Sequence, residues 1–139
     1  MDESFKLSGT SPWADQVELL SPDKKYKAIF SDGIEIGMGA PTMGTLMLYS
    51  ENKKVLSVDC TGASFLWSDD SQFFAYTKWT KTNQQIINIL KIDDMIARTI
   101  EQEMSVVKFE SFKNKILKGI DSPIYFSKHF SIDVNLLFK

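Results

Sequence analysis

Apolar and polar residues alternate in short runs along most of the chain, and turn-forming residues separate these runs roughly every 8 to 12 residues. Alternation with a period of two is typical of strands that bury one face. We therefore predict an all-β protein with two antiparallel sheets packed as a sandwich or open barrel, and at most one short helix. The predicted strands are Val17–Leu20, Tyr26–Phe30, Ile34–Met38, Thr45–Ser50, Val55–Asp59, Gln85–Ile92, Val106–Phe112 and Ile116–Ile120.

The clearest hairpin lies between Phe65 and Trp79. Its centre is Ser68-Asp69-Asp70-Ser71, whose short polar side chains can hydrogen-bond their own backbone and close a turn. Aromatic residues suited to a pleated, half-buried surface flank this turn on both sides. We expect the packing groups of the hairpin to be Trp67, Phe74, Tyr76 and Trp79.

Other connections are indicated by glycine, proline and acidic residues. Ser21–Lys25 predicts a turn with Pro22 at the position that fixes φ, and Asp32-Gly33 predicts a tight hairpin. Gly39–Gly44 predicts a loop. The segment Met95–Met104 is compatible with a helix, because Ile96, Ile100 and Met104 are four apart, but we favour a strand.

The ends of the chain differ in composition. Residues 1–14 mix Ser, Gly, Thr and Pro with single apolar residues, which predicts a loose N-terminal arm whose Phe5, Leu7 or Trp13 docks on the body. The tail Ile124–Phe138 is rich in Phe, Ile and Leu and is expected to pack. We expect residues 1–139 to form a single domain.

Charge and cysteine content narrow the function classes. The net charge of −2 does not indicate nucleic acid or an anionic membrane as partner, although residues 1–70 are acidic and residues 71–139 are basic. A single cysteine, Cys60, allows no internal disulfide and favours a reducing compartment. With no apolar run of the ~20 residues that a spanning helix needs, we expect a cytoplasmic protein without membrane contact.

The segment Ser21–Phe30 is echoed 47 residues later by Ser68–Thr77, with Ser, Asp, an aromatic residue and Ala in register. Trp67-Ser68-Asp69-Asp70 followed by Phe74-Ala75-Tyr76 resembles the blade signature of TolB-like and WD40-like β-propellers, although the usual Pro and Gly are missing. The resemblance covers residues 15–120. Two or three such sheets cannot close a ring, so the resemblance implies stacked sheets and a binding function.

Candidate chemistry is sparse. Gly39–Thr45 lacks the lysine of a phosphate-binding loop, and a strand follows it where a helix is required. His129 is the only histidine and fits a packing role better than a catalytic one, while Cys60 fits a small buried hydrophobe. The pairs Asp69-Asp70 and Asp93-Asp94 are explained by turns. No residue pattern indicates a metal or another cofactor.

These absences favour a non-catalytic module that binds another protein. The most concrete version is an immunity protein that occludes a co-produced bacterial toxin, because such proteins resemble this chain in size, slight acidity and lack of catalytic motifs. Carboxylates at turns and strand ends would meet a basic toxin surface, with an exposed aromatic residue as anchor. The expected binding residues are Asp23, Tyr26, Asp32, Glu35, Asp59, Asp69, Asp70 and Trp79.

Two alternatives remain open. A small-ligand or nucleic-acid-binding domain would use lysines interleaved with Phe109, Phe112 and Tyr125 in the C-terminal half, namely Lys108, Lys113, Lys115, Lys118 and Lys128. The other is a hydrolase that depends on His129. The oligomeric state is not determined by the sequence.

Overall fold

The computed structural model describes residues 9–122 and 126–138, which form an all-β fold with one short helix. Strands β1 to β7 join in chain order into one antiparallel sheet, and β8, β9 and β10 form a second. The two antiparallel sheets expected from the alternation are confirmed. The elements are β1 (Val17–Leu20), β2 (Tyr26–Glu35), β3 (Thr42–Ser50), β4 (Lys53–Trp67), β5 (Phe73–Trp79), β6 (Gln85–Lys91), β7 (Ile96–Met104), β8 (Val107–Lys113), β9 (Ile116–Asp121), β10 (Lys128–Asp133) and α1 (Val134–Leu137).

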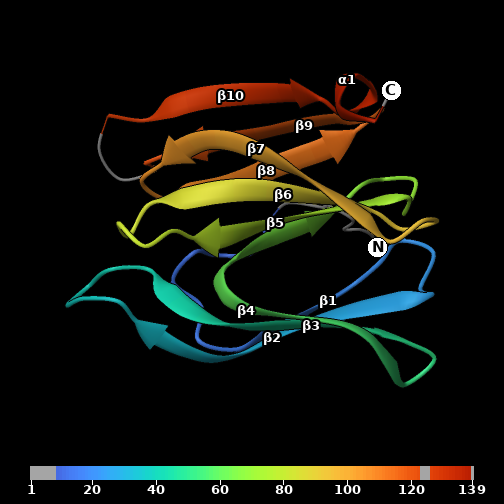
Figure 1. Ribbon diagram of the computed structural model, residues 1–139, viewed down its shortest axis with the longest axis horizontal. Helices are drawn as coiled ribbons and strands as arrows, with labels where there is room; N and C mark the ends of the chain where they lie inside the picture. Colours follow the sequence, from blue (N-terminus) through green and yellow to red (C-terminus); the bar gives the residue numbers. More distant parts are fainter. Residues whose placement is uncertain (1–8, 123–125, 139) are drawn as a thin grey trace, which may run out of the picture.

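The seven-stranded sheet folds over at β4, so the protein has three layers (Figure 1). The first layer contains β1, β2, β3 and residues 53–60 of β4. The middle layer contains residues 61–67 of β4 with β5, β6 and β7, and the third layer is the sheet of β8, β9 and β10. The strand passes between layers at Cys60, whose φ of 60° lies in the left-handed region.

The middle layer is buried on both faces along residues 61–67 of β4, β5 and β6, whereas β7 is mostly exposed. On one face Trp67, Phe74 and Tyr76 pack with Phe30 and Leu48 of the first layer. The opposite face packs against the third layer in a cluster of Leu66, Phe73, Ala75, Ile87, Ile89, Met104, Val107, Phe109, Phe112, Leu117 and Val134. Because both faces are covered, residues 61–68 are buried without the alternation expected of a surface strand.

Two predictions about β4 were wrong. Val55–Asp59 and the strand beginning at Phe65 are one strand, because Thr61 and Gly62 pair with β5 and β3 and do not form a break. Cys60 is exposed at the bend and is not a buried hydrophobe.

The expected hairpin at Asp32-Gly33 was also wrong. β2 continues to Glu35 through a bulge at Asp32, whose φ is 59°. The Gly33 N–H donates to the Asp15 carbonyl oxygen at 3.1 Å, and a Cβ on Gly33 would lie 2.8 Å from that oxygen. The reversal comes at residues 36–41, where Gly39 has a φ of 74°. A contact between distant parts of the chain therefore overrides the local Asp-Gly turn preference.

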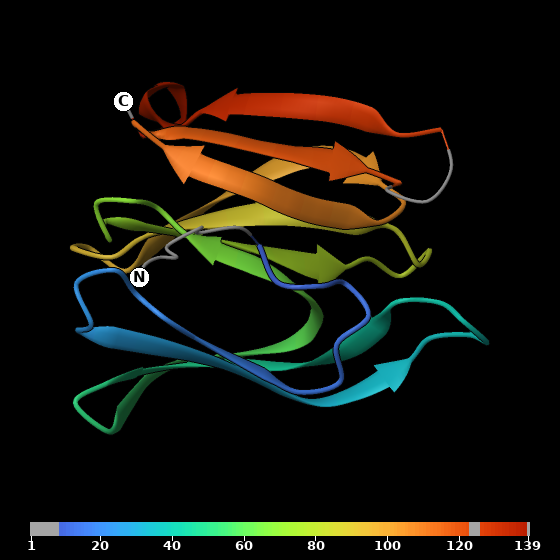
Figure 2. The same ribbon diagram turned by 180° about the vertical axis from the view of Figure 1, so that it is seen from behind.

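The N-terminal segment is packed from residue 9 onward, so the expectation of a loose arm was wrong for residues 9–14. The Gly9 N–H donates to the Phe109 carbonyl of β8 at 3.0 Å, and the Thr10 N–H donates to the Phe65 carbonyl of β4 at 3.2 Å. The segment then crosses from the middle layer to the first layer (Figure 2). Trp13 docks as expected, its indole donating to the Gly39 carbonyl at 3.1 Å. Phe5 and Leu7 lie outside the described residues.

The elements that follow β6 agree more closely with the predictions made from the sequence. Met95–Met104 contains strand β7, as favoured, and Ile100 and Met104 face the core while Ile96 is exposed. The tail forms β10 and α1, and Phe130 and Ile132 pack against the core, whereas Phe126 is exposed. Residues 123–125 lie outside the described residues. No helix in residues 9–122 and 126–138 has the length and apolarity to cross a bilayer.

The echoed segments form two turns with the same hydrogen bonds. In the first, Ser21 Oγ donates to Asp23 Oδ1 at 2.7 Å, which also accepts from the Lys25 N–H at 3.0 Å. In the second, Ser68 Oγ donates to Asp70 Oδ1 at 2.7 Å, which also accepts from the Gln72 N–H at 3.0 Å. The first turn joins β1 to β2 and the second joins β4 to β5. Each turn therefore connects the first two strands of its layer.

Candidate binding face

The repeat fixes which faces of the first and middle layers are equivalent. With the 47-residue offset, Glu18, Leu20, Lys27 and Ile29 correspond to Phe65, Trp67, Phe74 and Tyr76. In the middle layer this face is covered by the first layer. In the first layer the equivalent face points away from the molecule, and we call it the outer face.

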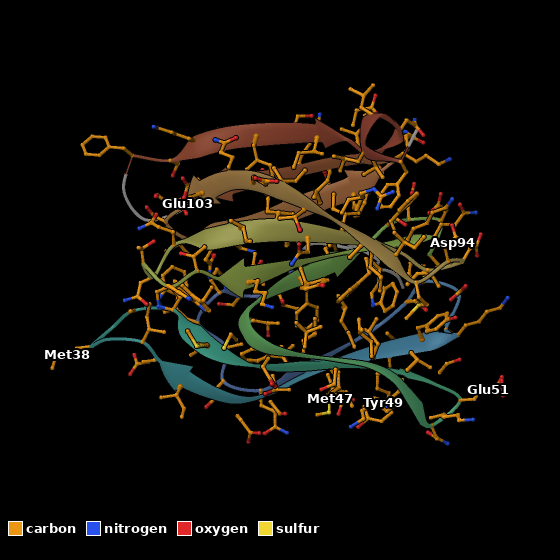
Figure 3. All side chains as sticks on the ribbon, in the orientation of Figure 1. Met38, Met47, Tyr49, Glu51, Asp94 and Glu103 are labelled. Carbon is orange, nitrogen blue, oxygen red and sulfur yellow. The ribbon has the colours of Figure 1, made fainter. Side chains whose placement is uncertain are left out.

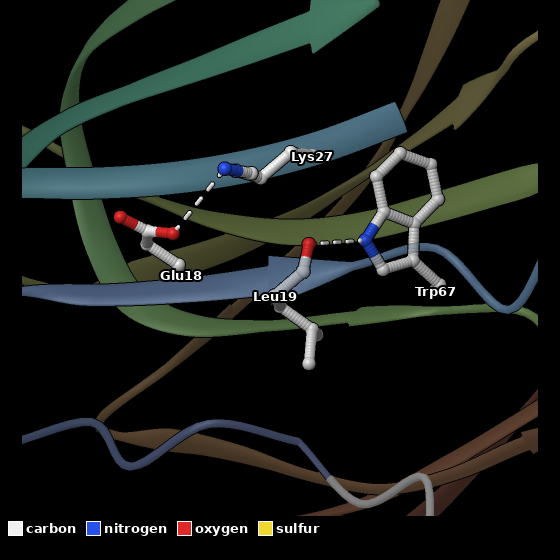
Figure 4. Close-up of polar contacts among 4 residues, drawn as sticks. All are labelled: Glu18, Leu19, Lys27 and Trp67. Atoms are coloured by element: carbon white, nitrogen blue, oxygen red, sulfur yellow. Dashed lines mark hydrogen bonds and ion pairs between the residues drawn. The ribbon is translucent and has the colours of Figure 1, made fainter. Parts of the chain in front are cut away.

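The covered face of the middle layer is aromatic. The Trp67 and Phe74 ring centroids are 4.5 Å apart, and those of Phe65 and Phe74 are 5.6 Å apart. The Trp67 indole also donates to the Leu19 carbonyl oxygen at 3.0 Å, which satisfies a carbonyl on edge strand β1 (Figure 4). This face is therefore sealed by the layer that precedes it in the chain.

On the outer face an ion pair replaces one aromatic pair. Lys27 Nζ lies 3.6 Å from Glu18 Oε1 (Figure 4). With the 47-residue offset, these two residues correspond to Phe74 and Phe65 of the middle layer. Both side chains are about half exposed. A polar outer face is what an end layer of a stack needs to stay in water.

Apolar side chains nevertheless surround this ion pair. Ile29 pairs with Met47 across β2 and β3, and Lys27 pairs with Tyr49 in the next outward-facing row. Met47 and Tyr49 project from β3 away from the middle layer (Figure 3). Leu20 and Val55 complete the set and are 45% and 41% exposed. Contiguous apolar groups with polar neighbours are the composition of a non-obligate protein interface.

A hollow of about 320 Å³ lies at one end of the outer face, between the β1–β2 and β3–β4 turns. We call it the basic hollow, and its lining is Leu20, Lys24, Lys25, Tyr26, Lys27, Ile29, Tyr49, Glu51 and Asn52. The two turns are fixed by left-handed residues, with φ of 66° at Lys24 and 67° at Asn52. Three lysines face one glutamate there.

Three of the predicted carboxylates have structural roles at the turns. Asp23 and Asp70 each close one of the equivalent turns. Asp69 accepts from the Asn114 N–H at 3.4 Å, and its own N–H donates to the Phe112 carbonyl, which ties the second turn to β8. A hydrogen bond also joins the β1–β2 turn to the β4–β5 turn, because the Asp23 N–H donates to Ser71 Oγ at 2.9 Å.

The pKa of Asp23 reflects these contacts. Desolvation raises the pKa of this carboxyl, but the Lys25 N–H, the Ser21 hydroxyl, the Lys25 charge and the Ser71 hydroxyl together lower it below the usual value. The charged carboxylate is therefore the form that holds the turn carrying Lys24 and Lys25.

The other predicted carboxylates lie away from the basic hollow. Asp32 is exposed at the β2 bulge, and Glu35 is exposed at the end of the same strand. Asp59 Oδ1 is 3.5 Å from Thr45 Oγ1, which places it beside an outward-facing residue of β3. The outer face therefore has an acidic end near the β4 bend and a basic end at the hollow.

The two predicted aromatic anchors have different environments. Tyr26 is half-buried, its ring centroid 6.1 Å from that of Trp67, and it lines the basic hollow. Trp79 is only 6% exposed and donates its indole N–H to the Thr42 carbonyl at 3.0 Å. Trp79 is therefore part of the core and is not available as an anchor.

The third layer does not bring the interleaved lysines and aromatics onto one surface. Phe109 and Phe112 are buried toward the middle layer, and Lys113 and Lys118 are exposed. Tyr125 lies outside the described residues. Phe126 is 93% exposed but is not one of the predicted aromatics, and the buried Phe109 and Phe112 offer no stacking surface to single-stranded nucleic acid.

His129 is exposed on β10, so the expectation that it packs in the interior was wrong. Its Nδ1 lies 3.8 Å from Glu110 Oε1, and its side chain is 74% exposed. Cys60 lies at the bend of β4, whereas His129 lies on β10 in the third layer, so the two side chains are not neighbours. Within the described ranges, no group of three or more His, Cys, Asp or Glu side chains is placed to hold a metal ion.

The sequence reading missed Leu20, Ile29, Met47 and Tyr49. A signal was present, because Ala28-Ile29-Phe30 and Leu46-Met47-Leu48-Tyr49 are apolar at successive positions, so both faces of these strands carry apolar groups.

Comparison of the chain with protein-family models, curated proteins and solved structures finds no match.

Proposed function

We propose that the protein is a non-catalytic protein-binding module that docks a partner on the outer face of its first layer. One observation carries the proposal. The same face is buried by sheet packing in the middle layer, and in the first layer it keeps apolar groups at Leu20, Ile29, Met47 and Tyr49 while adding the Glu18–Lys27 ion pair. Such a surface suits reversible association.

The charge distribution supports an oriented complex. Lys24 and Lys25 lie at one end of the outer face, and Asp32 and Asp59 lie toward the other. Complementary charges on a partner would raise the association rate and fix the orientation of docking. The apolar rows between the two ends would supply most of the affinity.

An immunity protein that occludes a bacterial toxin is the concrete form of this proposal. The propeller-blade resemblance fits the same general role, because stacked meander sheets present broad faces to partners. The carboxylates Asp32, Glu35 and Asp59 would then meet basic residues of the toxin, and the apolar rows would cover its cleft.

Isothermal titration against the product of the adjacent gene tests the proposal. We expect 1:1 binding with a Kd below about 1 μM, equivalent to about −8 kcal/mol. Inhibition of that product at equimolar ratio would identify the immunity form. An absence of binding at ten-fold higher concentration would contradict that form, and binding mapped to the third layer would contradict the general proposal.

A further inference from the structure

We propose that the basic hollow is the specificity pocket of the binding face, and that it receives a carboxylate side chain flanked by an apolar residue in an acidic segment of the partner. This inference rests on the proposed function and names the chemistry of the partner. It is carried by the lining of the hollow, its rigid rim and its position at the end of the apolar rows.

The lining combines positive charge with aromatic and aliphatic surface. Lys24, Lys25 and Lys27 face the hollow together with Tyr26 and Tyr49. Lys27 is 3.6 Å from Glu18, whereas Lys24 and Lys25 are in no ion pair within the described residues, although the charge of Lys25 also acts on the Asp23 carboxylate and Glu51 lies in the same lining. Two ammonium groups are therefore available to a carboxylate, and the ring faces and Leu20 can contact the apolar residue beside it.

The rim of the hollow is already in place before any ligand binds. The Lys24 N–H donates to the Ser21 carbonyl at 2.9 Å, and the Lys25 N–H donates to Asp23 Oδ1 at 3.0 Å. The neighbouring turn at Ser71 accepts from the Asp23 N–H at 2.9 Å. A turn held by three such bonds loses little entropy on binding, which favours a specific ligand over a diffuse one.

The equivalent turn of the middle layer carries different side chains. There Ser71 and Gln72 occupy the positions of Lys24 and Lys25, and Ser71 is buried against the first turn. The two lysines are thus a feature of the exposed copy, in which the turn borders solvent. The same turn geometry is used for packing in one layer and for presentation of charge in the other.

Protein NMR with two short peptides tests the inference. The probes are acetyl-Leu-Glu-Glu-Leu-amide and its glutamine analogue, each titrated into the full-length protein at low salt. We expect amide shifts confined to residues 20–27 and 49–52, with the glutamate peptide binding at least about ten-fold more tightly than the glutamine peptide. Equal binding of the two peptides, or shifts centred on another layer, would overturn the inference.

Charge reversal supplies the matched control. Lys24→Glu with Lys25→Glu should abolish binding of the glutamate peptide, while Lys81→Glu with Lys113→Glu makes the same charge change outside the hollow and should alter it less than two-fold. Inorganic phosphate is the second probe, and phosphate shifting the same amides as strongly as the peptide would overturn the assignment to an acidic segment.

Different results would contradict the inference about the basic hollow and the proposed function of the outer face. If a partner that docks on the outer face tolerates Lys24→Glu with Lys25→Glu but not Met47→Glu, the proposed function stands and the inference about the hollow is wrong. If the partner tolerates both changes, the proposed function is wrong. Met47 does not line the hollow, so these two variants report on different parts of the surface.

Discussion

The Trp67 indole N–H donates to the carbonyl oxygen of Leu19 at 3.0 Å, and this bond joins the middle layer to the edge strand of the first layer. Trp67 has no exposed surface and packs on Phe74 with ring centroids 4.5 Å apart. Trp67 therefore links the two layers both through the packing of its ring and through a hydrogen bond to the backbone of strand β1. We therefore expect Trp67 to contribute to the packing of the first layer on the middle layer, and so to the placement of the outer face.

Replacement of Trp67 by Phe should destabilise the protein by about 2 to 3 kcal/mol, because it leaves a cavity in the core and removes the hydrogen bond to the Leu19 carbonyl. Urea unfolding followed by circular dichroism measures the change. Trp13→Phe is the matched control, since the Trp13 indole also donates to a carbonyl but at an exposed site, and it should cost less than about 1 kcal/mol. Equal losses for the two variants would contradict this role of Trp67.

Gly33→Ala should destabilise the fold by at least about 2 kcal/mol. A Cβ there would lie 2.8 Å from the Asp15 carbonyl oxygen and 2.9 Å from the Asp15 Cα, and backbone atoms cannot move aside easily. Gly37→Ala is the control, because its nearest neighbour would be 3.9 Å away. It should change the free energy of unfolding by less than about 0.5 kcal/mol. A tolerated Gly33→Ala would show that the N-terminal segment is not packed on β2 as described.

The lowered pKa of Asp23 predicts a pH-dependent contribution to stability. Because its pKa in the folded protein lies below the unfolded value of about 3.9, the contribution is complete above that value and is lost as the pH falls through the folded pKa. Wild type should exceed Asp23→Asn in stability at pH 7 by less than about 1 kcal/mol, because solvent screens the charge of this exposed carboxylate. The difference should shrink as the pH falls through the folded pKa of Asp23.

Asp32→Asn is the control for this pH series, since no hydrogen bond or ion pair in residues 9–122 and 126–138 holds the Asp32 carboxylate. The free energy of unfolding of Asp32→Asn at pH 7 should lie within about 0.5 kcal/mol of the wild-type value. A difference for Asp23→Asn that grows on acidification would contradict the sign of the shift.

Glu18→Phe combined with Lys27→Phe should make the protein self-associate. The double change gives the outer face the aromatic pair that Phe65 and Phe74 form in the middle layer, where a further layer covers it. Sedimentation velocity should show a larger mean mass than wild type that rises with concentration. Lys81→Phe with Glu103→Phe adds the same rings at separate exposed sites and should associate less.

Local chemistry in the sequence was enough for many elements. The Ser68–Ser71 turn was predicted correctly, because Ser68 and Asp70 close it with local hydrogen bonds, and strand β1 has the predicted bounds Val17–Leu20. The bend of β4 at Cys60 and the bulge at Asp32 were not, because each involves contacts with residues distant in the chain. Thr61-Gly62 and Asp32-Gly33 look like turns until their distant neighbours are known.

The candidate face was harder to predict than the fold. Carboxylates such as Asp23 and Asp70 stand out in the sequence, yet their oxygens are used within the turns. Met47 and Leu48 are both apolar and adjacent, and only the structure shows that Leu48 is buried and Met47 lies on the open side. Which face of a two-sided apolar strand is covered is decided by the stacking order of the layers.

Titration calorimetry of the adjacent gene product against two variants tests the central claim most directly. Met47→Glu places a charge among the apolar rows of the outer face, and Ser131→Glu places one on an exposed site of β10 in the third layer. We predict that Met47→Glu weakens binding by about thirty-fold, equivalent to about 2 kcal/mol, while Ser131→Glu changes it less than two-fold. Wild-type affinity in Met47→Glu, or a larger loss in Ser131→Glu, would show that the partner does not dock on the outer face.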